Sequence, residues 1–197
     1  MNQWLKVILA FNCSIFLTLS CTSLKNHPVT IDDEHLAYEL LNQFDIIEGA
    51  LFYKTKGFDV DNRLKDWFNY ESINFNNRKE SYILERDRFV DFDTVFSSQQ
   101  QEKLDNNLKN IEPVNLKEEK LNINRLRYTR KRTELDVDFL QALTFPIIQR
   151  DKNDNIFAFF FYSWSSIDGL NGSSEIYIYK RDGDKWERFA VVFVSIT

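Results

Sequence analysis

The sequence predicts an α+β fold in which N-terminal helices pack on one face of a C-terminal antiparallel sheet of at least three strands. Apolar residues recur at helical spacing in the first half of the chain, and the last third holds runs of aromatic and β-branched residues separated by turn sequences. The chain has 197 residues, of which 43% are hydrophobic and 15% aromatic. This composition provides the apolar surface that one folded domain needs to offset its conformational entropy.

Two helices are predicted from apolar spacing and from their end signals. The first covers residues 32–48, and Gly49 follows it as a stop. The second begins after a capping serine, Ser97 or Ser98, and ends before Pro113. Both helices carry a single apolar stripe, so we expect each to bury one face.

The segments between these helices and the last third are dense in charged and polar residues. Residues 57–80 are rich in Asn and Asp and predict long loops around a short helix at 62–68. Residues 81–92 contain aromatic residues and leucine, and predict a strand. Residues 114–134 alternate apolar and charged side chains, which predicts one or two strands at a sheet edge.

The last third predicts the sheet. Residues 156–164 form an almost unbroken apolar run, which is typical of a central strand covered on both faces. Residues 175–180 and 186–196 are rich in strand formers, and Asp182-Gly183 between them is a dipeptide favoured in tight hairpin turns. These segments therefore predict an antiparallel hairpin beside a buried strand.

The first 21 residues have the three-part pattern of a secretory signal. Lys6 precedes an apolar stretch over residues 7–19, and the stretch ends at Ser20 and Cys21. A membrane-spanning helix needs about 20 apolar residues, and this stretch is shorter and contains polar interruptions. An ordinary signal peptide and an uncleaved anchor remain alternatives.

The end of this signal resembles the lipobox of bacterial lipoproteins, in which a cysteine is acylated and the chain is cut before it. The matching residues are Leu17, Leu19, Ser20 and Cys21. Thr18 stands where the motif usually has leucine. The resemblance implies a signal peptide over residues 1–20, a lipidated Cys21 with a tether to residue 29, and one domain over residues 30–197. It also implies a lipid-anchored protein of the cell envelope, at the outer membrane or at the periplasmic face.

Cysteine usage and charge restrict the chemistry. Cys13 and Cys21 both lie in the signal, so we expect a mature domain without a disulfide, a catalytic thiol or a cysteine metal site. Removal of residues 1–20 takes away one lysine and no acid, which shifts the net charge from −5 to −6. Nucleic-acid binders are normally basic, so we expect no nucleic-acid partner. The sequence carries no metal-binding or cofactor motif, and we expect neither ligand.

The last third also resembles secreted or lipid-anchored proteins of uncharacterised activity from bacteria of the Bacteroidetes type. The matching residues are Pro146 to Ile148, Asp151 to Asn155, Ala158 to Tyr162, Gly169, Gly172, Ile176 to Tyr179, Gly183, Trp186 and Phe193 to Ser195. Phe193 stands where tryptophan is common in these proteins, and the loop before Gly172 lacks the cysteines that some of them carry. The resemblance implies the same series of hairpins.

An aromatic set on the predicted strands is the first candidate binding surface: Tyr162, Trp164, Tyr177 and Tyr179. Alternate residues of a strand project to one face, so these side chains are expected to share a face beside a Gly/Ser loop. If they are exposed, they suit a protein or saccharide partner. If helices cover them, they belong to the core.

A basic cluster and a polar loop are weaker candidates. Arg125 and Arg127 would project from one face of an edge strand and suit a phosphate or an acidic partner, unless neighbouring acids pair with them. Asp151, Asn153 and Asn155 have the spacing of a calcium loop but lack its later glycine and acid, which favours a polar hairpin turn.

The sequence therefore favours a non-enzymatic lipoprotein that binds a partner in the envelope. Two alternatives stay open. The first is a periplasmic hydrolase that uses carboxylates, which the 30 acidic residues of the chain permit. The second is an immunity or inhibitor protein that binds a toxin or an enzyme.

Overall fold

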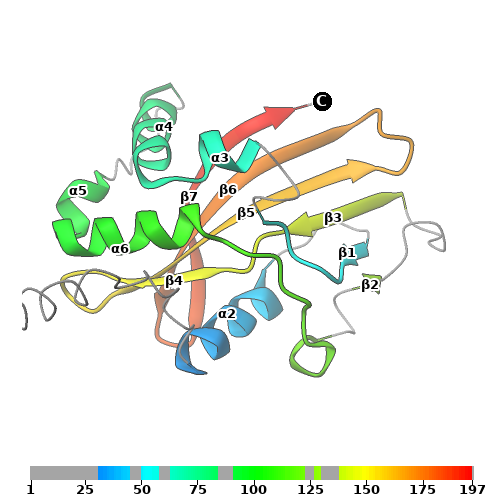
Figure 1. Cartoon of the computed structure of the whole chain (residues 1–197), viewed down its shortest axis with the longest axis horizontal. Helices are drawn as coiled ribbons and strands as arrows, with labels where there is room; N and C mark the ends of the chain where they lie inside the picture. The colour runs from blue at the N-terminus through cyan, green and yellow to red at the C-terminus, as the bar shows by residue number, and fades with distance from the viewer. Residues whose placement is uncertain are drawn as a thin grey trace, which may run out of the picture.

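The computed structural model describes residues 31–44, 50–57, 63–83, 91–122, 127–129 and 138–196. These residues form a seven-stranded sheet with helices packed against it, which confirms the α+β class (Figure 1). The helices are α2 (Ile31–Gln43), α3 (Arg63–Trp67), α4 (Tyr70–Ile83), α5 (Phe92–Val95), α6 (Ser98–Lys109) and a 3₁₀ turn (Glu118–Lys120). The strands are β1 (Ala50–Phe52), β2 (Arg127–Thr129), β3 (Phe139–Leu143), β4 (Ile147–Arg150), β5 (Ile156–Ser166), β6 (Gly172–Asp182) and β7 (Lys185–Ile196). The predicted signal, Cys21 and the tether lie outside the described residues.

The sheet has the strand order β2-β1-β3-β5-β6-β7, and β4 pairs with the part of β5 that β3 leaves open. β5, β6 and β7 are long antiparallel strands, as the last third of the sequence predicted. β1 runs parallel to both β2 and β3. β2 lies at one edge of the sheet, in agreement with the expected edge strand, and β7 lies at the other.

Helices cover both faces of the sheet, so the expectation that they pack on one face is wrong. Residues 157–163 of β5 are all buried, and they point alternately into two separate cores. α2 covers the face of Phe160, and α3, α5 and α6 cover the face of Phe159. A central strand that is apolar on both sides requires this arrangement, because either face left bare would expose aromatic rings to water.

Phe44, at the end of α2, is the centre of the first core. Its ring contacts four aromatic rings edge-on at centroid distances of 5.0–6.0 Å: Phe160, Tyr162, Tyr177 and Tyr179. The predicted helix at 32–48 is confirmed as far as Gln43, and residues 45–49 lie outside the described residues.

The second core rests on α6, whose start is capped by Ser97. The Ser97 hydroxyl accepts from the backbone N–H of Gln100, and the Gln100 side chain accepts in turn from the N–H of Ser97. This capping box selects Ser97 of the two predicted serines. Leu104 and Leu108 then project into the core, and the helix is confirmed.

The strand predicted over residues 81–92 is wrong in the described part. α4 extends to Ile83, and Phe92 begins α5, whereas residues 84–90 lie outside the described residues. The preceding polar segment is a helix because Asn69 caps α4 by accepting from the N–H of Ser72. Asn74 is buried and accepts from the N–H of Phe92, so its polarity serves packing between helices. The short helix at 62–68 is confirmed by α3.

Two of the hairpin turns, between β4 and β5 and between β6 and β7, follow from particular residues. The carboxylate of Asp151 accepts from the backbone N–H of Asn153 and Asn155 and from the Asn155 amide, which closes the turn between β4 and β5. At the β6–β7 turn the two loop residues are Gly183 and Asp184 rather than the predicted Asp182-Gly183 pair, because Asp182 already pairs with Lys185. Gly183 has a positive φ of 57°, the conformation that glycine adopts without strain.

Candidate functional site

The predicted aromatic surface is largely core. Tyr162 and Tyr179 are only 1% and 8% exposed, because Phe44, the residue that follows α2, covers that face. Their proposed role as exposed binding residues is corrected accordingly. Trp164 and Tyr177 are partly buried, and Trp164 packs edge-on against Phe139.

Tyr177 takes part in a short polar chain on this face. Its hydroxyl donates to Glu175, and the other carboxylate oxygen of Glu175 accepts from Ser173. Burial raises the pKa of Tyr177 strongly, and the nearby Glu175 carboxylate raises it further. The phenol therefore stays protonated and acts as a hydrogen-bond donor.

The structure describes one of the two weaker candidates, the polar loop, but not the side chains of the basic pair. Arg125 and the side chain of Arg127 lie outside the described residues, so their role as a binding pair stays a prediction. Asp151, Asn153 and Asn155 form the hairpin turn already described, and both carboxylate oxygens of Asp151 accept hydrogen bonds from that turn. The interpretation as a polar turn is confirmed.

A row of serines crosses three strands on the opposite face from α2. Ser163 of β5 pairs with Ser174 of β6, and Ser174 pairs with Ser195 of β7. We call these three residues the serine row. The adjacent row on the same face is large and apolar, with Phe161, Ile176 and Val192, so side-chain size falls sharply from one row to the next.

A β-bulge places the third hydroxyl in the row. The register of β6 and β7 shifts between Ser174 and Glu175, so that Val194 is skipped and Ser195 lies opposite Ser174. With a regular ladder, Val194 would face Ser174 instead. Bulges re-aim side chains in this way, and they are frequent beside functional sites.

Lys56 lies beside the serine row on a segment held from two sides. Its backbone N–H donates to the carbonyl of Leu143 at the end of β3. The preceding Thr55 exchanges hydrogen bonds with Val114, and the following Gly57 packs closely on Pro113. The Lys56 ammonium lies 5.3 Å from the centroid of the Phe161 ring, a cation–π distance. The position of this charge is therefore set by the fold.

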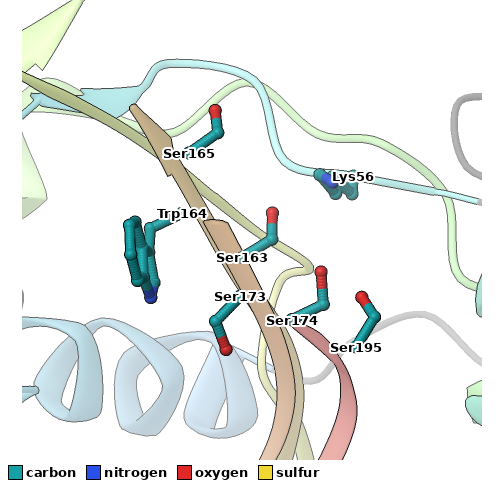
Figure 2. A pocket seen from close by; sticks show the side chains of 7 residues that line it. All are labelled: Lys56, Ser163, Trp164, Ser165, Ser173, Ser174 and Ser195. Atoms are coloured by element: carbon teal, nitrogen blue, oxygen red, sulfur yellow. The ribbon is translucent and has the colours of Figure 1, made fainter. Parts of the chain in front are cut away.

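Together these residues line a pocket of about 140 Å³, the serine pocket. Its lining residues are Lys56, Ser163, Trp164, Ser165, Ser173, Ser174 and Ser195. Figure 2 shows Ser163, Ser165, Ser174 and Ser195 directed to one side of the strands, towards the segment that carries Lys56, whereas Trp164 and Ser173 are directed to the other. Among these lining residues Lys56 alone carries a charge. The pocket is thus lined by hydroxyl groups and one ammonium, and the Ser163 hydroxyl among them donates to the carbonyl of Ala142.

A second hollow, of about 430 Å³, lies along the outer side of α2. It is lined by His35, Tyr38, Glu39, Asn42, Gln43 and Lys120. Two of these side chains bond to neighbouring segments: Asn42 donates to the carbonyl of Lys120, and Gln43 donates to the carbonyl of Asp184. This hollow mainly serves to join α2 to its neighbours.

Sequence reasoning did not find the serine pocket. The serines stand near strand ends and look like ordinary solvent-facing positions, and Lys56 stands in an unremarkable segment. A search for serines that face one another across paired strands would have found the row, but it needs the strand register.

Comparison of the chain with protein-family models, curated proteins and solved structures finds no match. Among the described residues, no cluster of His, Cys, Asp and Glu has an arrangement that suits a metal ion. No helix in the described ranges combines the length and apolar character needed to cross a membrane.

Proposed function

We propose that the chain is a lipid-anchored, non-enzymatic binding domain of a bacterial cell envelope. The observation that carries the binding function is the serine pocket, in which side chains from three strands and a separate segment converge on one space. Strands hold side chains more precisely than loops, which suits recognition of a small ligand.

The lipobox-like end of the export signal supports the anchor. Acylation of Cys21 would leave residues 22–29 as the link between the lipid and the described domain, which begins at Ile31. Eight residues span at most about 28 Å when fully extended. The described domain would then begin within that distance of the membrane surface.

The anchor is tested by Cys21→Ser in the chain expressed with its own signal. We expect this variant to lose acyl labelling and to leave the membrane fraction, whereas Cys13→Ser keeps both properties. An unchanged membrane fraction in Cys21→Ser would contradict the anchor.

The binding function is tested by native mass analysis of the full chain isolated from its own membranes in detergent. We expect a bound small molecule, and we expect Ser163→Val to displace it by filling the serine pocket. Ser98→Val is the control, because this serine is exposed on α6 and does not line the serine pocket. Turnover of an ester, amide or glycoside that Ser163→Val abolishes would instead favour a hydrolase.

A further inference from the structure

We propose that the sheet face opposite the serine pocket docks an arginine side chain of a protein partner, with the Glu175 carboxylate as its acceptor. The proposal goes beyond the serine pocket, because it uses other side chains of the same strands. It depends on the side chains that surround Glu175, on the hydrogen bonds that hold its carboxylate and on the partial exposure of the neighbouring rings.

Glu175 stands among aromatic side chains on the face that α2 partly covers. It pairs with Tyr162 of β5 and with Phe193 of β7. Tyr177 lies two residues further along β6, and Trp164 lies diagonally across on β5. Directly opposed residues and alternate residues of a strand share a face, so these side chains all project to the same side of the sheet. The carboxylate is therefore surrounded by rings.

The carboxylate is held in position but is not neutralised. Ser173 donates to one of its oxygens at 2.7 Å, and Tyr177 donates to the other at 3.0 Å. In the described part of the chain, no lysine or arginine forms an ion pair with Glu175. A partly buried charge without a cationic partner costs stability, so packing alone does not account for a glutamate at this position.

The acceptor sites that remain on Glu175 match a guanidinium group. Each carboxylate oxygen has about two lone pairs, and Ser173 and Tyr177 each use one. Burial raises the pKa of Tyr177, so its phenol stays protonated and continues to donate to Glu175. A guanidinium donates two parallel hydrogen bonds to the two oxygens of one carboxylate, whereas the ammonium of lysine is a point charge. The pinned carboxylate therefore favours arginine.

The rings beside Glu175 suit the flat face of the same group. Phe193 is 43% exposed, and Trp164 and Tyr177 are partly buried. Trp164 is directed away from the serine pocket (Figure 2), and it packs edge-on against Phe139 with 5.5 Å between the ring centroids. Guanidinium groups stack on aromatic rings and are attracted to their faces. A neutral saccharide could also stack on these rings, but it would not use the charge.

The test is an NMR titration of the full chain in detergent with the peptide Ac-Ala-Arg-Ala-NH2. We expect a saturable shift of the Trp164 indole N–H signal. The same peptide with citrulline in place of arginine keeps the shape without the charge, and it should bind about tenfold more weakly or worse. Glu175→Gln should weaken binding of the arginine peptide by a similar factor, because a neutral amide cannot accept both charged hydrogen bonds.

Glu187→Gln is the matched control. Glu187 is exposed on β7 and pairs with Lys180, which alternation places on the other face of the sheet from Glu175. The control removes the same charge, so peptide affinity should stay within about twofold of the parent. An equal loss in Glu187→Gln and Glu175→Gln would show general charge attraction and would overturn the proposal. Trp164→Leu leaves the carboxylate in place and should weaken binding about fivefold, which guards against a folding defect in Glu175→Gln.

The remaining outcomes separate this proposal from its competitors. Equal affinity for the arginine and citrulline peptides, or no binding of either, would overturn it. Cellotriose that shifts the Trp164 signal where the arginine peptide does not would assign the face to a saccharide and would overturn it as well. Ser163→Val fills the serine pocket and should leave peptide affinity unchanged, so failure of this proposal is distinguishable from failure of the binding function proposed for that pocket.

Discussion

Arg181 and Glu39 form a two-point ion pair that joins the β6–β7 hairpin to α2. The Arg181 Nε and Nη2 atoms donate to the two carboxylate oxygens of Glu39 at 2.9 and 3.1 Å. Both side chains are about one-fifth exposed, and the Glu39 carboxylate raises the pKa of the Arg181 guanidinium. The pair thus fixes α2 to the β6–β7 hairpin.

Glu39→Gln should lower the free energy of unfolding by about 1 kcal/mol, because a neutral amide cannot accept both charged hydrogen bonds. Chemical denaturation measures the loss. Glu102→Gln, at an exposed position of α6, is the control and should be neutral. Equal stability of the two variants would show that the ion pair does not hold α2 in place.

Phe44→Ala should lower the free energy of unfolding by about 3–5 kcal/mol, because it removes the ring that contacts four others in the first core. Thermal and urea unfolding report the change. Phe75→Ala removes the same side chain from a position of α4 that is 64% exposed and should stay within about 0.5 kcal/mol of the parent. The idea of a core centred on Phe44 would be abandoned if both variants had the same effect.

Gly57→Ala should both destabilise the fold and weaken binding in the serine pocket. A Cβ atom at this position would lie 2.5 Å from Cδ and 2.8 Å from the backbone nitrogen of Pro113, so the segment that carries Lys56 must move. Gly183→Ala is the comparison, since a Cβ there meets nothing within 4 Å and only the positive φ opposes it. Gly183→Ala should lower the free energy of unfolding by about 1 kcal/mol and should leave the serine pocket unchanged. Chemical unfolding together with native mass analysis of the ligand in the serine pocket separates the two effects, and an unchanged ligand occupancy in Gly57→Ala would argue against positioning of Lys56 by this contact.

Acid pH should weaken the contact between α2 and the 3₁₀ turn. Hydrogen bonds from the Lys117 and Lys120 ammonium groups, at 2.6 and 3.0 Å, lower the pKa of Glu34 below its ordinary value. The folded-state pKa therefore lies below the unfolded-state pKa, so the stabilisation is present at neutral pH and is lost as the pH falls through the lowered value. A carboxyl-detected NMR titration should place Glu34 below the unpaired glutamates. Lys117→Met should move its midpoint upward, and no movement would rule out Lys117 as the main cause.

The sequence predicted elements whose signals are local. Three such signals act through neighbouring residues. The capping serine of α6 and the apolar run of β5 were confirmed. The turn at Gly183 was predicted one residue too early. α4 was missed because its Asn-rich sequence reads as loop. Asn69 caps the helix and Asn74 is buried against Phe92, and these uses depend on tertiary contacts.

The candidate site was less predictable than the fold. The tyrosines of β5 and β6 are attractive as a surface because their alternation is visible in the sequence, but alternation does not show which face a helix covers. Phe44 settles that point by packing on Tyr162 and Tyr179. The serine pocket gave no signal, because small polar residues at strand ends are common on any exposed sheet.

By itself the sequence determined that a two-sided apolar strand would be the centre of an α+β domain, since local propensity and hydrophobic periodicity are properties of consecutive residues. The tertiary structure alone decided that Lys56 would meet serines of three strands. That meeting depends on strand register, on the bulge that skips Val194 and on the close contact of Gly57 with Pro113. Each of these three features depends on residues that are far apart in the sequence, so a pattern of consecutive residues does not predict it.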